Sequence, residues 1–389
     1  MRRLLAVLLV LGIVPVAQAQ DPWRSSYFPY VLGTPTDGVM LVLRWQRTQN
    51  APYFLEQTDE KDRINPITFR GAVSIEGGAG TRGSRFLRVE TRLPAVVAGW
   101  RFHGMLGAER QGRFGYYGVG ADLADADPDA PNTDANRIHR ERWLARFEAT
   151  RTIHGPFRFG VGLFADRTSL SAATDSGAFG DRFGTPRRRT SIVVRPALVV
   201  DTRDREFTPS RGVLLEAGAG FGSGREQSLG VPDNDGGFYG FGYAQFKGYF
   251  SPREGTVLAG RALVRRMAER APLSARFGLP GWEREVTLSG ADGHRGLPAG
   301  ALAATDLELY SLEVRHDLLN AGDLGAVTLL GFADWARVED RRSVRLGSAD
   351  FFGAGAGVAL RVLRSAILTT SFAGGPNGFN FSMGTNWSF

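Results

Sequence analysis

The sequence offers few side chains whose spacing suits catalysis or metal binding. It has 389 residues and no cysteine, which excludes thiolate nucleophiles, disulfides and cysteine-ligated metals. Its histidines are dispersed and show no metal-ligand spacing; they are His103, His139, His154, His294 and His316. No Gly-x-Ser-x-Gly nucleophile motif occurs. We therefore expect a protein that is not an enzyme and that binds no metal and no cofactor.

Two short segments resemble ligand-binding motifs but lack essential features. Residues 78–83 match Gly-x-Gly-x-x-Gly, yet they fall in a predicted hairpin turn with no following helix, which argues against a dinucleotide site. Residues 125–136 begin like a calcium loop, with aspartate at the first, third and fifth positions. However, Ala130 replaces the required glycine and Asn136 the required glutamate. We interpret this run as an acidic surface loop; loose binding of calcium or of calcium-bridged lipopolysaccharide stays open.

The chain is basic, and almost all of its positive charge is carried by arginine. It has 47 Lys and Arg against 40 Asp and Glu, for a formal net charge of +7, and Lys61 and Lys247 are its only lysines. Such a balance could indicate nucleic-acid or phosphate binding. The arginines are scattered, however, and usually stand near a carboxylate. We interpret them as the lining of a polar interior and expect no nucleic-acid partner.

The N-terminus has the three parts of a secretory signal peptide. Residues 1–3 are positively charged, residues 4–14 are apolar, and residues 17–19 form a small-x-small cleavage site. We expect the signal peptide to span 1–19 and a short N-terminal segment to span 20–37. The apolar stretch is short for a membrane span, and no cysteine follows it to carry a lipid. The protein is therefore predicted to be exported.

The remainder of the chain alternates apolar and polar residues with the period of a β-strand. Leu87 and Val89 alternate with Arg88 and Glu90, and residues 380–389 follow the same pattern. No apolar run approaches the roughly 20 residues that a spanning helix needs. In lipid every backbone group must be paired, so a spanning sheet must close. Its outward residues meet lipid and its inward residues meet a polar lumen, which explains charge of both signs on one face.

The sequence thus predicts an all-β fold: a closed antiparallel transmembrane β-barrel that occupies residues 38–389 as one domain. The even number of strands, about 16, is typical of bacterial barrels, and short turns alternate mostly with longer polar loops. The predicted strands lie near 38–48, 66–77, 84–93, 99–109, 113–120, 138–151, 157–170, 188–203, 211–223, 236–250, 255–269, 304–318, 323–336, 351–363, 365–374 and 378–389.

The C-terminus carries an aromatic pattern at strand spacing. Gly384, Trp387 and Phe389 resemble the C-terminal β-signal of outer-membrane proteins, in which alternate aromatic residues of the last strand face lipid. A soluble edge strand ending in bare aromatic residues would be prone to aggregation. The resemblance implies an outer-membrane location and recognition by the machinery that inserts barrels.

A charged turn is predicted between the eighth and ninth strands. Asp201, Arg203 and Asp204 precede Pro209 and Gly212, an arrangement suited to a turn held by Asp–Arg pairing, with proline fixing φ and glycine relieving the chain. It resembles the D-T-R-D…P-x-x-G turn of BamA/TamA-like outer-membrane assembly barrels, the bacterial surface antigen family, which places it on the periplasmic side. A generic charged turn is the alternative.

A second resemblance to that family lies in the long loop 270–303. Its segment 293–297 reads Gly-His-Arg-Gly-Leu and is similar to the family's [VI]-R-G-[FY] loop tip. The resemblance implies that the loop folds into the lumen and that Arg295, followed by Gly296, pairs with acidic residues on the inner wall. Glu313 and Asp334 both point inward in the alternation. We expect Arg295 and Asp334 to form a lock with Glu313 close by, since an arginine fork can bridge carboxylates.

The resemblance also implies a function. Family members of this kind aid the assembly, insertion or translocation of proteins or lipids at the outer membrane, through a seam between the first and last strands. The expected partners are outer-membrane lipids and lipopolysaccharide, client proteins or a periplasmic partner, and the barrel assembly machinery. Departures are His294 and Leu297 at the loop tip, Trp335 after Asp334, and the lack of POTRA domains. The alternatives are a passive anion-favouring pore and a membrane anchor for a separate periplasmic partner.

Overall fold

The computed structural model describes residues 23–34, 36–50, 69–125, 134–174, 177–184, 186–228, 236–281, 285–321, 325–341, 343, 347–362, 366–376, 378–385 and 387–389. The predicted signal peptide and most of the acidic segment 125–136 lie outside these residues.

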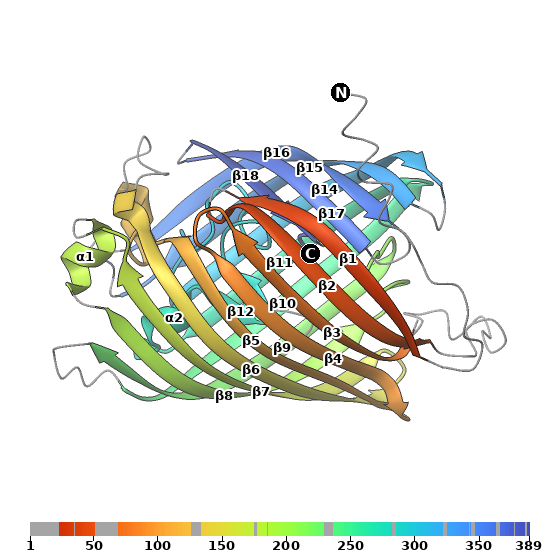
Figure 1. The fold of residues 1–389 in the computed structure, drawn as a ribbon, viewed down its shortest axis with the longest axis horizontal. Helices are drawn as coiled ribbons and strands as arrows, with labels where there is room; N and C mark the ends of the chain where they lie inside the picture. Colours follow the sequence, from red (N-terminus) through yellow and green to blue (C-terminus); the bar gives the residue numbers. More distant parts are fainter. Residues whose placement is uncertain are drawn as a thin grey trace.

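Sixteen strands form one antiparallel sheet that curls into a barrel (Figure 1). Each strand pairs with its neighbours in chain order. The strands are β1 Trp23–Thr34, β2 Gly38–Asn50, β3 Phe69–Gly80, β4 Arg85–Val97, β5 Trp100–Gly115, β6 Arg137–His154, β7 Phe157–Ala172, β8 Arg187–Asp201, β9 Gly212–Ser228, β10 Gly236–Arg253, β11 Thr256–Met267, β14 Asp306–Asn320, β15 Gly325–Glu339, β16 Ser348–Val362, β17 Ala366–Gly375 and β18 Gly378–Gly384. The predicted fold class is confirmed.

The remaining elements are short and gather toward one end of the barrel. They are α1 Ala178–Phe183, α2 Leu273–Arg276, the paired strands β12 Gly278–Pro280 and β13 Glu285–Thr287, and the 3-10 turns Gly120–Asp125 and Asp134–Asn136. We call this end, at the left of Figure 1, the long-loop end. The opposite end, with tight connections such as β6–β7 and β10–β11, is the short-turn end. Among the described residues, no helix is long and apolar enough to cross a membrane.

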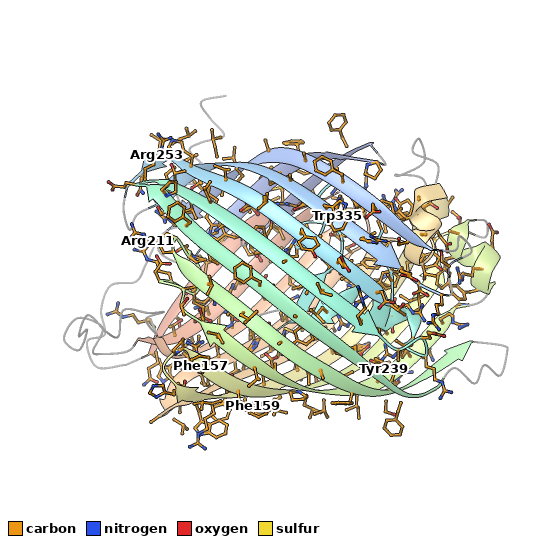
Figure 2. The ribbon with its side chains drawn as sticks, turned by 180° about the vertical axis from the view of Figure 1, so that it is seen from behind. Phe157, Phe159, Arg211, Tyr239, Arg253 and Trp335 are labelled. Atoms are coloured by element: carbon orange, nitrogen blue, oxygen red, sulfur yellow. The ribbon has the colours of Figure 1, made fainter. Side chains whose placement is uncertain are left out.

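The two faces of the sheet differ as the alternation predicts. On β14, Tyr310, Leu312 and Val314 are exposed on the outside, whereas Glu313 and Arg315 are buried on the inside. Phe157 and Phe159 on β7 likewise project outward (Figure 2). An apolar exterior around a charged interior is the arrangement expected of a barrel in lipid.

Two predicted boundaries are wrong, and their effects on the strand count cancel. The barrel begins at Trp23 rather than at residue 38, because β1 occupies most of the segment predicted to precede it. Polar residues and Pro29 obscure the alternation in β1, although Tyr27 and Val31 do face outward. The predicted strands 99–109 and 113–120 are one strand, β5. Its polar run from Glu109 to Arg113 resembles a turn, but the ladder to β6 continues past it through a register shift.

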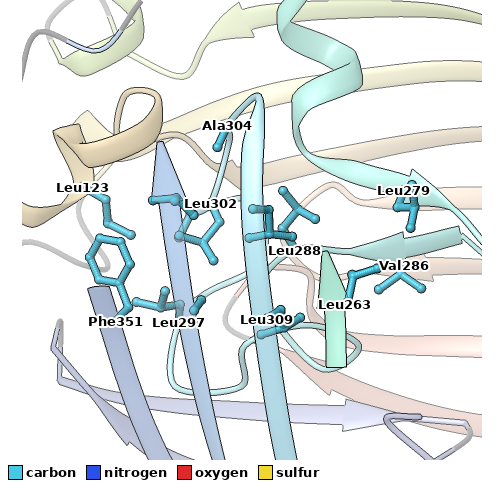
Figure 3. Close-up of a cluster of buried hydrophobic side chains, with 14 of the residues drawn as sticks. Leu123, Leu263, Leu279, Val286, Leu288, Leu297, Leu302, Ala304, Leu309 and Phe351 are labelled. Atoms are coloured by element: carbon cyan, nitrogen blue, oxygen red, sulfur yellow. The ribbon is translucent and has the colours of Figure 1, made fainter. Parts of the chain in front are cut away.

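The barrel has an apolar core inside its lumen. The connection between β11 and β14 packs Leu279, Leu288, Leu297 and Leu302 against wall residues such as Phe351 (Figure 3). A second cluster lies beside it, joining the β5–β6 and β7–β8 connections to α2. Apolar side chains thus fill the lumen toward the long-loop end.

Candidate functional site

The lumen loop connects β11 with β14 and spans residues 268–305. Its described residues, 268–281 and 285–305, lie inside the barrel as predicted. Its side chains at Leu288, Leu297 and Ala304 are fully buried. Wall arginines also hold its backbone. Arg265 donates to the Gly278 oxygen at 2.6 Å, and Arg146 on β6 donates to the Gly281 oxygen at 2.6 Å. The loop is therefore fixed to both sides of the lumen.

The tip of the lumen loop brings together the three residues that were predicted to form an arginine lock. The Nε and Nη2 atoms of Arg295 donate to the two carboxylate oxygens of Asp334, both at 2.8 Å. The backbone N–H of Arg295 also donates to Asp334, at 2.9 Å, and its Nη1 atom donates to Glu313. The guanidinium carbon lies 3.6 Å from the centre of the Phe332 ring. Each nitrogen of the guanidinium group thus donates to a carboxylate on the wall.

The strand register explains why both carboxylates reach one arginine. Ser311 on β14 is opposite Asp334 on β15, and Glu313 is opposite Phe332, so the two acids are diagonal neighbours on the inner face. Arg315 approaches Glu313 from the other side, at 2.7 Å. Burial alone would lower the pKa of Arg295, but hydrogen bonding and attraction to Asp334 and Glu313 outweigh it and raise the pKa.

Gly296 is required by close packing rather than by its backbone angles. A Cβ atom there would lie 2.9 Å from the Gly374 oxygen and 3.0 Å from the Gly353 Cα. His294 on the other side of Arg295 is fully buried, and its ring lies 3.2 Å from the Phe351 oxygen. Burial lowers the pKa of His294 below its ordinary value. The loop tip is therefore seated tightly against β16 and β17.

Two further residues hold the loop tip and were not predicted. The Asn380 side chain on β18 donates to the Arg295 oxygen at 2.8 Å and to the Leu297 oxygen at 3.1 Å. Arg261 on β11 donates to the oxygens of Asp292 and Gly293. Both are inward polar positions, which the alternation could have identified, but the pattern does not say which of many such residues meets the loop.

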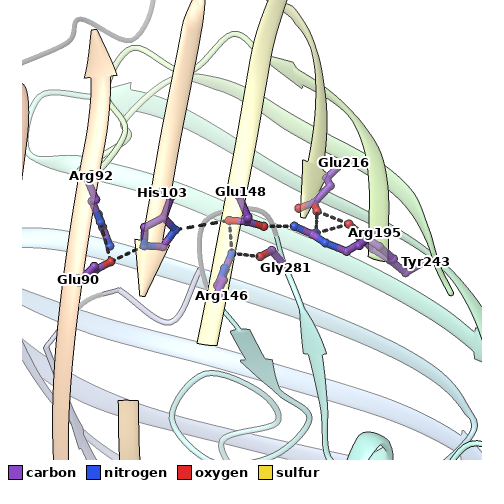
Figure 4. A network of polar contacts seen from close by, with 9 residues as sticks. All are labelled: Glu90, Arg92, His103, Arg146, Glu148, Arg195, Glu216, Tyr243 and Gly281. Carbon is purple, nitrogen blue, oxygen red and sulfur yellow. Dashed lines mark hydrogen bonds and ion pairs between the residues drawn. The ribbon is translucent and has the colours of Figure 1, made fainter. Parts of the chain in front are cut away.

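A chain of polar and charged groups crosses the inner wall from β4 to β10 (Figure 4). His103 lies 2.8 Å from Glu90 and 3.4 Å from Glu148. Glu148 contacts Arg195, which donates to Glu216 at 2.6 Å. Ion pairs that link neighbouring strands in this way compensate the charge that the lumen buries.

The predicted turn between β8 and β9 has the expected internal pairing. Arg203 contacts Asp201 at 2.9 and 3.0 Å through two nitrogens, and Asp204 accepts the backbone N–H of Ser210 at 2.9 Å. Gly212 has a φ of +96°, and a Cβ there would lie 2.3 Å from the Thr202 oxygen. Pro209 is buried in the turn. The turn is at the short-turn end of the barrel.

The predicted placement of the C-terminal aromatic residues is wrong. The last strand ends at Gly384, and Trp387 and Phe389 lie inside the barrel instead of facing lipid. Trp387 packs with Leu330 of the inner wall, and Phe389 packs with Tyr249. The pattern does not reveal this placement because alternation describes a strand, whereas arginines from distant strands create the competing environment in the lumen. Recognition of the motif by the insertion machinery stays a prediction.

The barrel has a seam between its first and last strands. β1 and β18 are the two edges of the sheet, and no ladder joins them among the described residues. They nevertheless lie side by side, since a Cβ atom on Gly33 would be 3.3 Å from the Met383 sulfur. β18 has seven residues and β17 has ten, compared with 18 for β6 and β10.

These features define a sixteen-stranded barrel with a lumen loop and a seam. No family model and no curated protein matches the sequence. Among solved structures, it is similar to BamA from Haemophilus ducreyi lacking POTRA domains 1–3, at 12% identity and a TM-score of 0.54, over 97% of this chain and 76% of that one. It is also similar to CdiB from Escherichia coli, at 12% identity and a TM-score of 0.58. A third similar structure is CdiB from Acinetobacter baumannii, at 11% identity and a TM-score of 0.52.

The match to the Escherichia coli CdiB covers 95% of this chain but only 63% of that chain. The match to the Acinetobacter baumannii CdiB covers 94% of this chain and 60% of that chain. The fold of this protein is therefore that of the BamA and CdiB barrels. Together with the apolar exterior, it supports a location in the outer membrane.

Proposed function

We propose that this protein is an outer-membrane barrel that aids the insertion or translocation of proteins, or of lipids, at its seam. The observation that carries the proposal is the seam itself: two strand edges lie side by side, and no ladder joins them in the described part of the chain. Unpaired strand edges bind further strands readily, because their N–H and C=O groups lack partners. A seam of this kind can accept a client strand or let a lipid pass.

The filled lumen favours traffic at the seam over the alternative function of a passive pore. A passive anion-favouring pore needs a continuous aqueous path. Here the lumen loop packs Leu288, Leu297 and Leu302 into an apolar cluster with wall residues, and the loop is held by Arg146, Arg265 and Asp334 on different strands. These contacts support traffic at the side of the barrel rather than through its centre.

The proposed role is non-enzymatic and needs no cofactor. Its partners would be outer-membrane lipids and lipopolysaccharide, client proteins, and the machinery that inserts this barrel. In the alternative function, the barrel is a membrane anchor for a separate periplasmic partner. If the chain acts only as an anchor for that partner, the seam should be dispensable.

A seam lock tests the proposal. Cysteines at Gly33 and Met383 should form a disulfide across the seam, because a Cβ atom at Gly33 would lie 3.3 Å from the Met383 sulfur. The chain has no native cysteine to compete with them. Purified barrel in liposomes is then assayed for accelerating the insertion of an unfolded client barrel. We expect the oxidised variant to lose the acceleration and reductant to restore it.

The matched control places cysteines at Leu163 and Val194, which face each other on β7 and β8. This disulfide should leave the acceleration unchanged because it joins strands that are already paired. Equal acceleration by the locked and unlocked seam would refute the proposal. Depletion in the host with outer-membrane proteomics and a lipid-asymmetry assay then separates protein from lipid traffic.

A further inference from the structure

The C-terminal residues leave the sheet and turn into the lumen. The ladder of β17 with β18 ends at the pair Thr369 and Gly384. Beyond it, Trp387 and Phe389 are 9% and 5% exposed. On β18 itself, Asn380 and Ser382 are buried on the inner face while Phe379 is exposed on the outer face. A strand continued with this alternation would carry both terminal aromatic residues outward into lipid.

Instead, Phe389 lies among three arginines from separate parts of the barrel. The guanidinium carbons of Arg261, Arg315 and Arg295 are 4.9, 5.8 and 5.9 Å from the centre of its ring. Arg315 also donates to the main-chain oxygen of Phe389 at 3.0 Å and lies 4.3 Å from the centre of the Trp387 ring. Two aromatic residues and one backbone oxygen thus meet a buried cationic wall.

Loss of water around the three arginines explains why this environment binds aromatic residues. Arg261, Arg295 and Arg315 are each no more than 3% exposed. The Nη1 atom of Arg315 is buried and, in the part of the chain that is described, has no hydrogen-bond partner. The negative face of an aromatic ring is attracted to such desolvated cations.

We propose that Arg261, Arg295 and Arg315, together with Tyr249, form a pocket that binds the chain's own C-terminal aromatic segment, Trp387–Phe389. The ligand class is a peptide segment that presents an aromatic side chain and a main-chain oxygen. Docking in the pocket withdraws the segment from the sheet, so that residues 366–368 of β17 lack a described β18 partner. The pocket therefore keeps the strand edges unpaired at the short-turn end of the seam.

The lumen loop and the seam become coupled through this pocket. Arg295 belongs to the loop tip and contacts the Phe389 ring. Its main-chain oxygen also accepts a hydrogen bond from the Asn380 side chain of β18. The strand end therefore has two environments for its aromatic residues, one in lipid beside β1 and one among the arginines. If the pocket arginines are removed, the C-terminal segment should return to the edge of the sheet.

Crosslinking with a short bis-maleimide reads the position of the tail, since the chain contains no native cysteine. Cysteines at Ala259 and Ser388 report docking, because Ala259 packs in the cluster that contains Phe389. Cysteines at Ser26 and Ser388 report a C-terminal segment that lies along β1, because both positions face the lumen when β18 continues with its alternation. We expect the first pair to crosslink at least five-fold more than the second in the folded barrel.

Arg261→Gln with Arg315→Gln should reverse this ratio, and Arg189→Gln, a buried arginine on β8 away from the pocket, should leave it unchanged. Phe389→Tyr should keep the docked position and Phe389→Leu should weaken it. If the two arginine changes together prevent folding, the comparison of Phe389→Tyr with Phe389→Leu tests the proposal by itself. The proposal would be overturned if crosslinking to position 26 dominated in the folded barrel. It would also be overturned if neither the arginine changes nor the Phe389 changes altered the ratio. The readout is independent of any activity on client proteins.

Discussion

At the scale of single residues, the lumen depends on complete pairing of buried charge. Arg295, Glu313 and Asp334 are each no more than 3% exposed, and an ionised group left alone in such a place costs far more than its pair contributes. Arginine suits the position because its planar fork can reach two carboxylates at once, which a lysine ammonium cannot do.

Removing the arginine of the lock should destabilise the barrel. Arg295→Ala leaves two buried carboxylates without their main cation, and breaking one partner of a buried pair costs about 3–5 kcal/mol. We expect a clearly lower unfolding temperature in a heat-modifiability gel. Arg266→Ala is the control, since that arginine is 55% exposed beside Glu308 and such pairs contribute about 0–1 kcal/mol. Equal unfolding temperatures for the two variants would show that the pairing is not a lock.

The glycine of the loop tip should tolerate no side chain. Gly296→Ala places a methyl group 2.9 Å from a backbone oxygen, and such overpacking costs about 1–3 kcal/mol. The variant should unfold at lower temperature than the parent. Gly331→Ala on β15 is the control, because nothing lies within 4 Å of a Cβ there. A stable Gly296→Ala barrel would mean that the tip is seated loosely.

His294 should make stability depend on pH. Because burial lowers its pKa in the folded state, the neutral ring stabilises the barrel fully above the ordinary value of about 6.5, and this contribution falls as pH drops below it. Unfolding in urea should therefore become easier between pH 7 and 5.5, and less so in His294→Gln. Parallel pH profiles for the two proteins would contradict a buried neutral histidine.

At the scale of elements, alternation and turn chemistry predict most of the barrel. Strands such as β14 are evident because every second residue is apolar, and the β8–β9 turn is evident from its aspartates and arginine. β1 is not, since Pro29 and early serines weaken its pattern. The lock was predictable only through a resemblance, whereas Asn380 and the lumenal aromatic residues depend on contacts between distant strands that no local pattern encodes.

The β8–β9 turn offers a test of how far its glycine is required. Gly212→Ala combines a φ of +96° with a Cβ that would meet the Thr202 oxygen at 2.3 Å. Gly255→Ala in the β10–β11 turn has a φ of +72° but its nearest neighbour is 3.6 Å away. Strain alone costs about 1–2 kcal/mol, so Gly212→Ala should lower folded yield by clearly more than Gly255→Ala. Equal yields from refolding would remove the steric argument.

At the scale of the whole molecule, the lumen loop decides whether the barrel conducts. The loop is fixed to opposite walls and surrounded by apolar side chains, so the intact protein should show no steady conductance in a planar bilayer. Replacing residues 278–303 with a short Gly-Ser linker should produce open channels, and the inward arginines should make them favour anions. The same linker inserted at Gly155, in the tight β6–β7 turn, is the control and should leave the bilayer silent. Steady channels in the intact protein would favour the pore over the seam, because solutes would then cross through the centre that the loop is expected to close.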